Sequence, residues 1–240
     1  MKILIIRHGD PDYENDALTE LGRREAEALA ERMKNVKADE CYVSPLNRAA
    51  ETASYSLETM NMKAQVLPWL REFAPVVERP QGKGIAWDWL PQDLALMPYA
   101  YDPDRWTEYP ALEEAGVRSE IDWIYSEFDD FLIKHGYRKE GKLFKAERPN
   151  SDTIVLFCHF GLGCVLLSYL LNLPVFVLWH STIAAPTSVT TVVTEERREG
   201  IAQFRMTAFG DTSHLYVAGM QPSFSGRFRE LYTNEDERMD

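Results

Sequence analysis

Two arginines and two histidines stand at points where this sequence changes from a predicted strand into a loop or a helix. Arg7 and His8 end an apolar run at the start of the chain, and His159 ends a second apolar run in its latter half. Arg48 lies close to the predicted start of a helix. In open α/β sheets, ligands bind just beyond the carboxyl ends of the strands. We therefore expect these four side chains to meet at one edge of a sheet.

Side chains of these types suit a phosphoryl group. Arginine binds phosphate oxygens bidentately through its planar guanidinium group. A neutral histidine can attack phosphorus and form a covalent phosphohistidine, which divides one difficult step into two. Nearby positive charges disfavour an imidazolium, so Arg7 and Arg48 are expected to keep His8 neutral and to stabilise charge on the transferring oxygens. The helix after His159 presents free N–H groups, which also suit an anion.

The departing alkoxide of a phosphate ester needs a proton donor. A carboxylic acid can donate this proton and then act as the base for the attacking water. Glu72, in the segment Leu70-Arg71-Glu72 after the third predicted strand, is our candidate. The alternatives Glu14, Glu51 and Glu78 stay open, because sequence alone supplies no distances.

The five histidines raise the alternative of a metal site. The sequence contains neither a His-Glu-x-x-His motif nor the paired cysteines typical of zinc sites. Two arginines close to His8 and His159 also oppose a bound cation. This pattern favours anion chemistry without a metal.

Composition limits the partners. The chain has 240 residues, of which 45% are hydrophobic, enough for one domain with an insertion. Its net charge of -12 argues against nucleic acid or an anionic membrane as a partner. The longest apolar stretch, residues 165–173, is shorter than the about 20 residues that span a bilayer. Three cysteines and no recognisable signal peptide predict reduced thiols in the cytoplasm.

Strand and helix patterns alternate at both ends of the chain, which predicts a three-layer α/β/α fold with a mostly parallel sheet. We expect strands at residues 2–6, 39–43, 64–67 and 153–158, and a hairpin of strands 188–194 and 201–206 joined by a charged turn at 195–200. We expect helices from an N-cap at Thr19 to residue 33, from an N-cap at Ser44 to about residue 60, and from His159 to about residue 171.

Residues 79–150 interrupt this alternation and are expected to form a helical, aromatic-rich insertion within a single domain of residues 1–240. The insertion holds four of the six tryptophans. An amphipathic helix is predicted around residues 121–132, followed by a polar loop at 138–152. The aromatic side chains are expected to form either packed core or a lid over the site, because long insertions often have that role.

Taken together, these motifs resemble the histidine phosphatase superfamily, also called the phosphoglycerate mutase-like family. The resemblance is carried by Arg7-His8-Gly9, by Leu18-Thr19-Glu20-Leu21-Gly22, by Ser44-Pro45-Leu46 with Arg48, Ala49, Glu51 and Thr52, by Glu72, by His159, and by Gly210-Asp211-Thr212-Ser213-His214-Leu215. Each motif alone is weakly specific, whereas their order and spacing together are strongly specific.

The resemblance implies that His8 is the nucleophile and that Glu72 is the proton donor. It further implies that Arg7, Arg48 and His159 hold the phosphoryl group. It points to the phosphatase branch: a phosphoric monoester hydrolase of the histidine acid phosphatase type, acting on a small phosphorylated substrate. Neither a metal nor an organic cofactor is implied.

Three positions depart from the family pattern. Asp10-Pro11 follows the first motif, and Pro11 supplies neither a hydroxyl nor an N–H to a phosphate. Glu14 stands where the family usually has Asn, and Asn15, one place late, is not assigned to the site. Phe160 replaces the usual glycine after the second histidine, so its ring is expected to narrow or line the pocket.

The function predicted from these residues is phosphomonoester hydrolysis through a phosphohistidine on His8. A phosphoglycerate-type phosphomutase is the first alternative, although the longer mutase segment after Arg-His-Gly is missing. A phospho-ligand-binding regulatory protein without catalysis is the second, because of Asp10-Pro11 and Phe160. The aromatic insertion favours an apolar or ring-bearing leaving group, whereas the substrate and the oligomeric state stay undetermined.

Overall fold

The computed structural model describes residues 1–237. Residues 238–240, which belong to the predicted domain of residues 1–240, lie outside the described part. Eight strands form one sheet: β1 (Lys2–Arg7), β4 (Glu40–Val43), β5 (Ala64–Val66), β8 (Tyr137–Glu140), β9 (Leu143–Ala146), β10 (Thr153–Cys158), β11 (Val189–Arg198) and β12 (Ile201–Asp211). Their order across the sheet is β5-β4-β10-β1-β11-β12-β9-β8. Two short pairs lie outside it, β2 (Pro11–Asp12) with β3 (Ala17–Leu18) and β6 (Val76–Arg79) with β7 (Gly82–Ile85).

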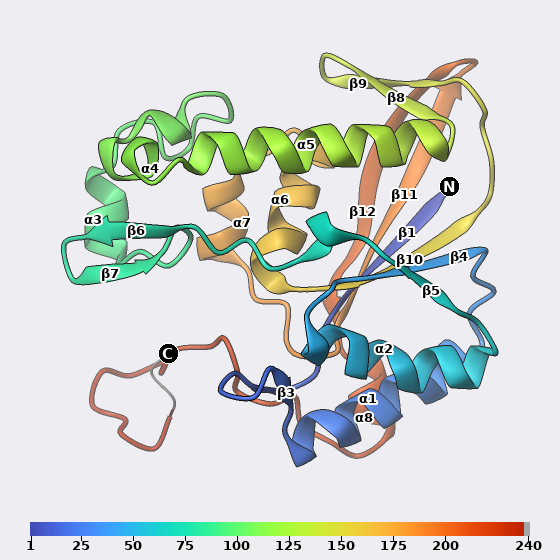
Figure 1. Ribbon diagram of the computed structural model, residues 1–240, viewed down its shortest axis with the longest axis horizontal. Helices are drawn as coiled ribbons and strands as arrows, with labels where there is room; N and C mark the ends of the chain where they lie inside the picture. Colours follow the sequence, from blue (N-terminus) through green and yellow to red (C-terminus); the bar gives the residue numbers. More distant parts are fainter. Residues whose placement is uncertain (238–240) are drawn as a thin grey trace.

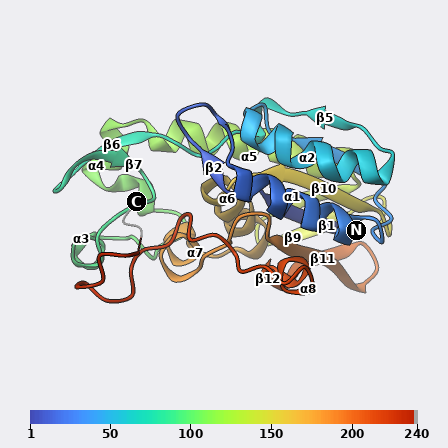
Figure 2. The ribbon, with the colours of Figure 1, turned by 90° about the horizontal axis from the view of Figure 1, so that it is seen from below.

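Helices cover both faces of the sheet, so the predicted three-layer α/β/α class is confirmed. The helices are α1 (Glu20–Met33), α2 (Asn47–Met60), α3 (Pro91–Leu96), α4 (Pro110–Glu114), α5 (Val117–Lys134), α6 (Phe160–Leu171), α7 (Val175–Ser181) and α8 (Ser213–Val217), with 3-10 turns η1 (Pro68–Leu70) and η2 (Trp106–Glu108). α1 and α2 lie on one side of the sheet, and α5, α6 and α7 lie on the other (Figure 1). Figure 2 shows α1 and α2 side by side, with the stretch after α8 running past α7.

The sheet has a parallel and an antiparallel half. β5, β4, β10 and β1 run parallel, so their carboxyl ends meet at one edge. The other half is built by the β11–β12 hairpin and by β8 and β9, which pair antiparallel. Arg7 and His159 therefore lie at the same edge, because β1 and β10 pair in register with Arg7 opposite Cys158.

The parallel strands read as continuous apolar runs because both of their faces are covered. Alternate residues of a strand point to opposite faces. Ile3 and Ile5 of β1 pack in the core beneath α5 and α6, whereas Leu4 and Ile6 pack in the core beneath α1 and α2. The same alternation holds along β10. This two-sided burial accounts for the correct prediction of both strands.

Helix α1 follows its predicted pattern. The Thr19 side chain accepts a hydrogen bond from the Gly22 N–H, as an N-cap residue does. Ala26, Leu29, Ala30 and Met33 form a buried apolar stripe along the helix. Helix α6 likewise spans the predicted residues.

Two predictions in the antiparallel half are wrong. The segment 138–152, predicted as a polar loop, contains most of β8 and all of β9, where buried Phe144 and Ala146 alternate with exposed residues. The charged turn predicted at residues 195–200 is mostly strand, because the β11–β12 ladder continues until Arg198 pairs with Ile201. Charged residues occupy these strands because the hairpin extends beyond the core, where the side chains meet solvent.

Much of the segment 79–150 packs against the main core. The apolar face of α5, including Ile121, Ile124 and Phe128, is buried in the same core as Ile3 and Ile5. Trp106 stacks edge-on against Trp179 of α7, with 5.6 Å between the ring centroids. In residues 1–237, no helix is both long and apolar enough to cross a membrane.

We expect Phe128→Ala to lower the free energy of unfolding by about 3–5 kcal/mol, because it removes a fully buried ring from α5. Urea denaturation followed by circular dichroism measures this change. Leu96→Ala is the matched control in the same segment, since Leu96 is 84% exposed and its truncation should cost no more than about 0.5 kcal/mol. Equal effects of the two substitutions would contradict a shared core.

Candidate active site

His8 is the first residue beyond β1 and is almost completely buried. Its backbone is held on both sides: its N–H donates to the Cys158 carbonyl, and its carbonyl accepts from the Thr187 N–H. The Nδ1 atom lies 2.7 Å from the Gly9 carbonyl oxygen. A carbonyl only accepts, so Nδ1 must carry the proton and Nε2 keeps its lone pair.

The surroundings of His8 keep its ring neutral. Burial is the largest cause that lowers the pKa of His8 well below its ordinary value. The positive charge of Arg7 lowers this pKa further, the Gly9 hydrogen bond opposes it, and the Arg48 charge adds a smaller lowering. His8 is therefore an unprotonated base at neutral pH.

His159 lies beside His8 at the start of α6. Their ring centroids are 5.2 Å apart. Nε2 of His159 lies 2.7 Å from the Ser44 hydroxyl oxygen, which also accepts from the Leu46 N–H. We therefore assign the hydroxyl proton to this contact, which leaves Nδ1 of His159 protonated. Burial, His8, Arg48 and Arg7 all lower the pKa of His159.

The Ser44 contact corrects one prediction. Helix α2 begins at Asn47 with Leu46 as its N-cap residue, so Ser44 is not the cap. Its side chain turns instead toward His159, across the edge of the sheet. Ser44 is thus a site residue that belongs to a recognised motif. We predicted it as a helix cap, whereas it contacts His159.

Both guanidinium groups are buried and only partly satisfied. Arg7 donates to the carbonyls of Ala184 (2.7 Å) and Ser225 (3.3 Å). Arg48 forms an ion pair of 2.6 Å with Asp16. Among residues 1–237, the Nε atoms of Arg7 and Arg48 find no hydrogen-bond partner, and neither does Nδ1 of His159. Buried polar atoms of this kind are rare, and at a site they are typical of groups that bind a ligand.

Glu72 lies against the first turn of α6. Its carboxyl group accepts N–H bonds from Leu162 (2.8 Å), Gly161 (3.3 Å) and its neighbour Phe73 (2.8 Å). Burial raises the pKa of Glu72, against the opposing effects of these three donors and of Arg7. We expected the N–H groups at the start of α6 to bind an anionic ligand. They bind the Glu72 carboxyl group instead.

The other candidate acids lie in different surroundings. Glu51 binds Arg23 and the Leu18 N–H. Glu78 is exposed and pairs with Lys83, and Glu14 is exposed. The Arg7 charge acts on the Glu72 carboxyl group, although burial has the larger effect on its pKa.

A close approach of two glycines holds the loop after His8 on α1. A Cβ atom on Gly9 would lie 2.7 Å from the Gly22 carbonyl oxygen, and one on Gly22 would lie 2.3 Å from the Asp10 carbonyl oxygen. Any side chain at either position would push the loop away. The Gly9 N–H also donates to the Thr52 hydroxyl of α2. The two helices thereby fix the carbonyl that orients His8.

The stretch after α8 covers the Arg7 guanidinium group. Besides the Ser225 carbonyl, Gly226 approaches so closely that a Cβ atom there would lie 3.0 Å from two guanidinium nitrogens. The Ser223 N–H donates to buried Glu25, which also accepts from the Asp10 N–H. The remaining cavity beside Arg7 and His159 has a volume of about 20 Å³.

Phe160 lines this small cavity, as predicted from its replacement of a glycine. Its ring centroid lies 5.9 Å from the Arg7 guanidinium carbon and 5.8 Å from the Trp87 ring centroid. Pro11 is buried in the β2–β3 pair, opposite Leu18. Asn15 is exposed and bonds Asp12, whereas the next residue, Asp16, reaches Arg48.

The structure thus brings together His8, Arg7, Arg48 and His159, with Glu72 close by. Sequence reasoning missed Asp16 and the stretch around Ser225. Asp16 has a positive φ of 47° in an irregular loop, so no periodic pattern predicts its direction. Residues 221–226 carry no motif that links them to Arg7.

Comparisons with known proteins find one family model and several solved structures. Residues 3–79 match the sequence model of the histidine phosphatase superfamily (branch 1). This part of the chain, 77 of its 240 residues, is similar to that superfamily. The matched part includes Arg7, His8, Arg48 and Glu72, whereas His159 lies beyond it. A search of curated proteins finds no match.

Solved structures share the fold of this chain. A phosphoserine phosphatase from Entamoeba histolytica is 20% identical with a TM-score of 0.60, covering 89% of this chain and 98% of its own. A mycobacterial glucosyl-3-phosphoglycerate phosphatase is 20% identical with a TM-score of 0.52, covering 87% and 98%. The α-ribazole phosphatase from Shigella flexneri is 17% identical with a TM-score of 0.53, covering 88% and 97%. At such identities the likeness concerns the fold.

We expect Arg48→Met to raise the pKa of His8, because removing a nearby positive charge favours the imidazolium. Proton NMR titration of the His8 ring measures this shift. In the native protein, the ring should titrate well below the ordinary histidine value. Lys63→Met, which removes an exposed cation elsewhere, is the control and should leave His8 unchanged. An ordinary His8 titration in the native protein would refute the electrostatic argument.

Proposed function

We propose that the protein is a metal-independent phosphomonoester hydrolase of the histidine acid phosphatase type, acting through a phosphohistidine on His8. One observation carries the proposal: the Gly9 carbonyl holds the Nδ1 proton of His8, so that Nε2 offers a lone pair beside two buried guanidinium groups. The unpartnered Nε atoms of Arg7 and Arg48 supply donors for phosphoryl oxygens. These cations provide the charge stabilisation that phosphoryl transfer needs.

In the first step, Nε2 of His8 attacks the phosphorus atom. The P–N bond forms as the P–O bond to the alcohol breaks, and the bonding electron pair leaves with the alkoxide oxygen. Glu72 in its protonated form gives its proton to this oxygen, so the product leaves as a neutral alcohol. Arg7, Arg48 and His159 hold the three phosphoryl oxygens during the transfer.

In the second step, water attacks the same phosphorus atom. The Glu72 carboxylate accepts a proton from the water, the P–O bond forms and the P–N bond breaks. Inorganic phosphate leaves, and Nε2 of His8 regains its lone pair. His8 suits both steps because its ring begins and ends the cycle neutral, with the proton on Nδ1 and the lone pair on Nε2.

The assignment of Glu72 rests on its surroundings. Its pKa is raised by burial, so the carboxyl group holds a proton at higher pH than an exposed glutamate. Glu51 and Glu78 are engaged in ion pairs with Arg23 and Lys83. Glu72 therefore fits a proton donor better than these alternatives.

The substrate we propose is a small phosphate monoester. The solved structures of similar fold include enzymes named phosphoserine phosphatase, glucosyl-3-phosphoglycerate phosphatase and α-ribazole phosphatase. Trp87 and Phe160 flank the Arg7 side of the site. Their rings support the narrower hypothesis of an apolar or ring-bearing leaving group.

A second candidate is a phospho-ligand-binding protein without turnover. The Asp16 carboxylate pairs with Arg48, and two backbone carbonyls accept from Arg7. Some of the N–H donors of both guanidinium groups are therefore already used within the protein. Saturable phosphate binding without release of product from any phosphate ester would favour this candidate over the hydrolase.

We expect His8→Ala to reduce phosphate release from 4-nitrophenyl phosphate by about 10⁴-fold or more, since it removes the nucleophile. The assay is run with EDTA and with a circular dichroism check of folding. His180→Ala, which alters a histidine of α7, is the control and should keep most of the activity. A fully active His8→Ala protein would refute the phosphohistidine, as would failure to trap an acid-labile phosphoenzyme in the native protein.

We expect kcat/KM to show two limbs with pH. The rate falls at low pH where His8 takes up a proton, below the ordinary histidine range because its pKa is lowered. The rate falls at high pH as Glu72 loses its proton, and this limb lies above the ordinary glutamate value because its pKa is raised.

The Glu72→Gln variant tests the second limb. It should lose the alkaline limb and slow the hydrolysis of phenyl phosphate by about 10²-fold or more. The effect on 4-nitrophenyl phosphate should be smaller, because 4-nitrophenolate leaves without a proton. Glu78→Gln is the matched control. A pH profile of Glu72→Gln identical to the native one would rule out its role.

A further inference from the structure

A second pocket, larger than the cavity beside Arg7 and His159, lies near the end of α6 that is farther from His159. Its volume is about 460 Å³, which is within the about 300–1,000 Å³ typical of small-molecule sites. His159 precedes the first turn of α6, whereas Ser168 and Tyr169 of its last turns line this pocket. At a rise of about 1.5 Å per residue, Tyr169 is about 15 Å along the helix from His159. The two cavities share no lining residue within the described part of the chain.

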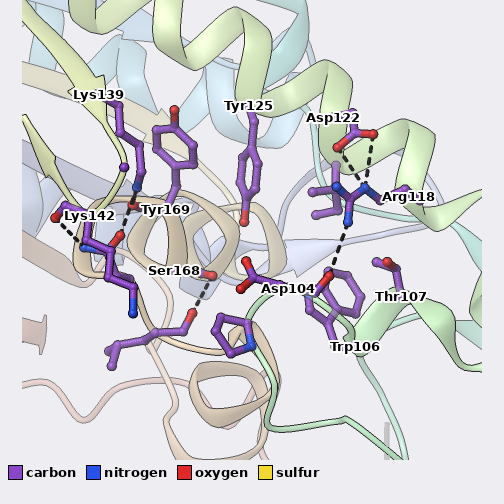
Figure 3. A pocket seen from close by; sticks show the side chains of 15 residues that line it. Asp104, Trp106, Thr107, Arg118, Asp122, Tyr125, Lys139, Lys142, Ser168 and Tyr169 are labelled. Atoms are coloured by element: carbon purple, nitrogen blue, oxygen red, sulfur yellow. Dashed lines mark hydrogen bonds and ion pairs between the residues drawn. The ribbon is translucent and has the colours of Figure 1, made fainter.

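Three further segments complete the wall of this pocket, as Figure 3 shows. They are residues 103–107, one side of α5, and the turn between β8 and β9. Trp106 and Ile121 provide apolar surface. The Tyr125 hydroxyl points into the pocket in the direction of Ser168 (Figure 3). Burial raises the pKa of Tyr125, so its hydroxyl is available as a donor.

One end of the pocket carries positive charge without a matching acid. Lys139 of β8 is half-buried, and its Nζ donates to the Tyr169 carbonyl and to Oδ1 of Asn172. Within residues 1–237, Lys139 and Lys142 make no ion pair. The acid that acts most on Lys139 is Asp129, whose carboxylate already accepts from the Tyr169 hydroxyl. Burying an ammonium group without an acid partner is unfavourable, and an anion would relieve this cost.

The other end of the pocket has balanced charge. Arg118 of α5 pairs with Asp122 one turn later, at 3.0 Å, and also donates to the Asp104 carbonyl. The Asp104 carboxylate adds a negative charge there. This end therefore suits hydroxyl groups of a ligand and opposes a second anionic group.

We propose that this pocket binds a small organic molecule with a single anionic group, either a carboxylate or a phosphate. The anionic group lies on Lys139 and Lys142. A hydroxylated ring body extends past the Tyr125 and Ser168 hydroxyls toward Arg118. The site is separate from the catalytic cavity and does not depend on the function proposed for His8.

Three probes that share a hexose ring distinguish a carboxylate site from a phosphate site. Glucuronate carries the carboxylate, glucose 6-phosphate carries the phosphate, and glucose carries neither. Isothermal titration calorimetry should show saturable binding of at least one anion and none of glucose. Crystals soaked with the anion that binds should place it against Lys139. For glucose 6-phosphate, the His8→Ala protein is used, so that hydrolysis does not interfere.

Two charge-removing variants test the assignment. Lys139→Met keeps the length of the side chain, and Lys142→Met changes an exposed position that cannot affect folding. Each should weaken binding of the anion by about tenfold, the effect of one charge-assisted hydrogen bond. Lys63→Met carries the same charge change far from the pocket and should bind as the native protein does.

Phosphate release from 4-nitrophenyl phosphate should stay unchanged in both pocket variants, which separates this site from the catalytic one. Unchanged anion affinity in both variants would overturn the proposal. The proposal would also be overturned if neither anion showed saturable binding at concentrations up to about 50-fold above those that saturate the site at His8.

Discussion

The buried positive charge of Arg7 and Arg48 is the constraint on which the site depends. Two guanidinium groups below the surface must be compensated by nearby acceptors or by a ligand. The chain supplies part of this compensation through the Asp16 carboxylate and the Ala184 and Ser225 carbonyls. Burial, and with it the same charge, lowers the pKa of both histidines. The guanidinium N–H groups without a partner among residues 1–237 match the oxygens of a phosphoryl group.

The parallel half of the fold was predictable because its burial is two-sided. Strands 2–7 and 153–158 are apolar on both faces, so a simple run of apolar residues is enough to find them. The antiparallel half was harder, since the strands at 137–146 and 189–211 leave the core and carry charged residues on solvated faces. Their ladder depends on pairing partners far away in the chain, which no local pattern reveals.

The site residues differ in the same way in how far the sequence predicts their positions. His8 and His159 directly follow strand ends, so sheet topology alone brings them together. Ser44 belongs to a recognisable motif, yet its partner could be found only once β4 and β10 were paired. Asp16 and Ser225 act through the shape of irregular loops, and a loop's path depends on contacts rather than on periodicity.

The contact between Arg7 and the stretch around Ser225 has a consequence for how the chain folds. Arg7 and Ser225 are separated by 218 positions, so the contact joins β1 to a segment that is synthesised much later. A chain growing from its amino end carries an uncovered guanidinium group at its sheet edge until residue 225 arrives. Contacts between such distant positions form late because closing so long a loop is costly in entropy. Until that contact forms, the Arg7 guanidinium group lacks one of its two carbonyl acceptors.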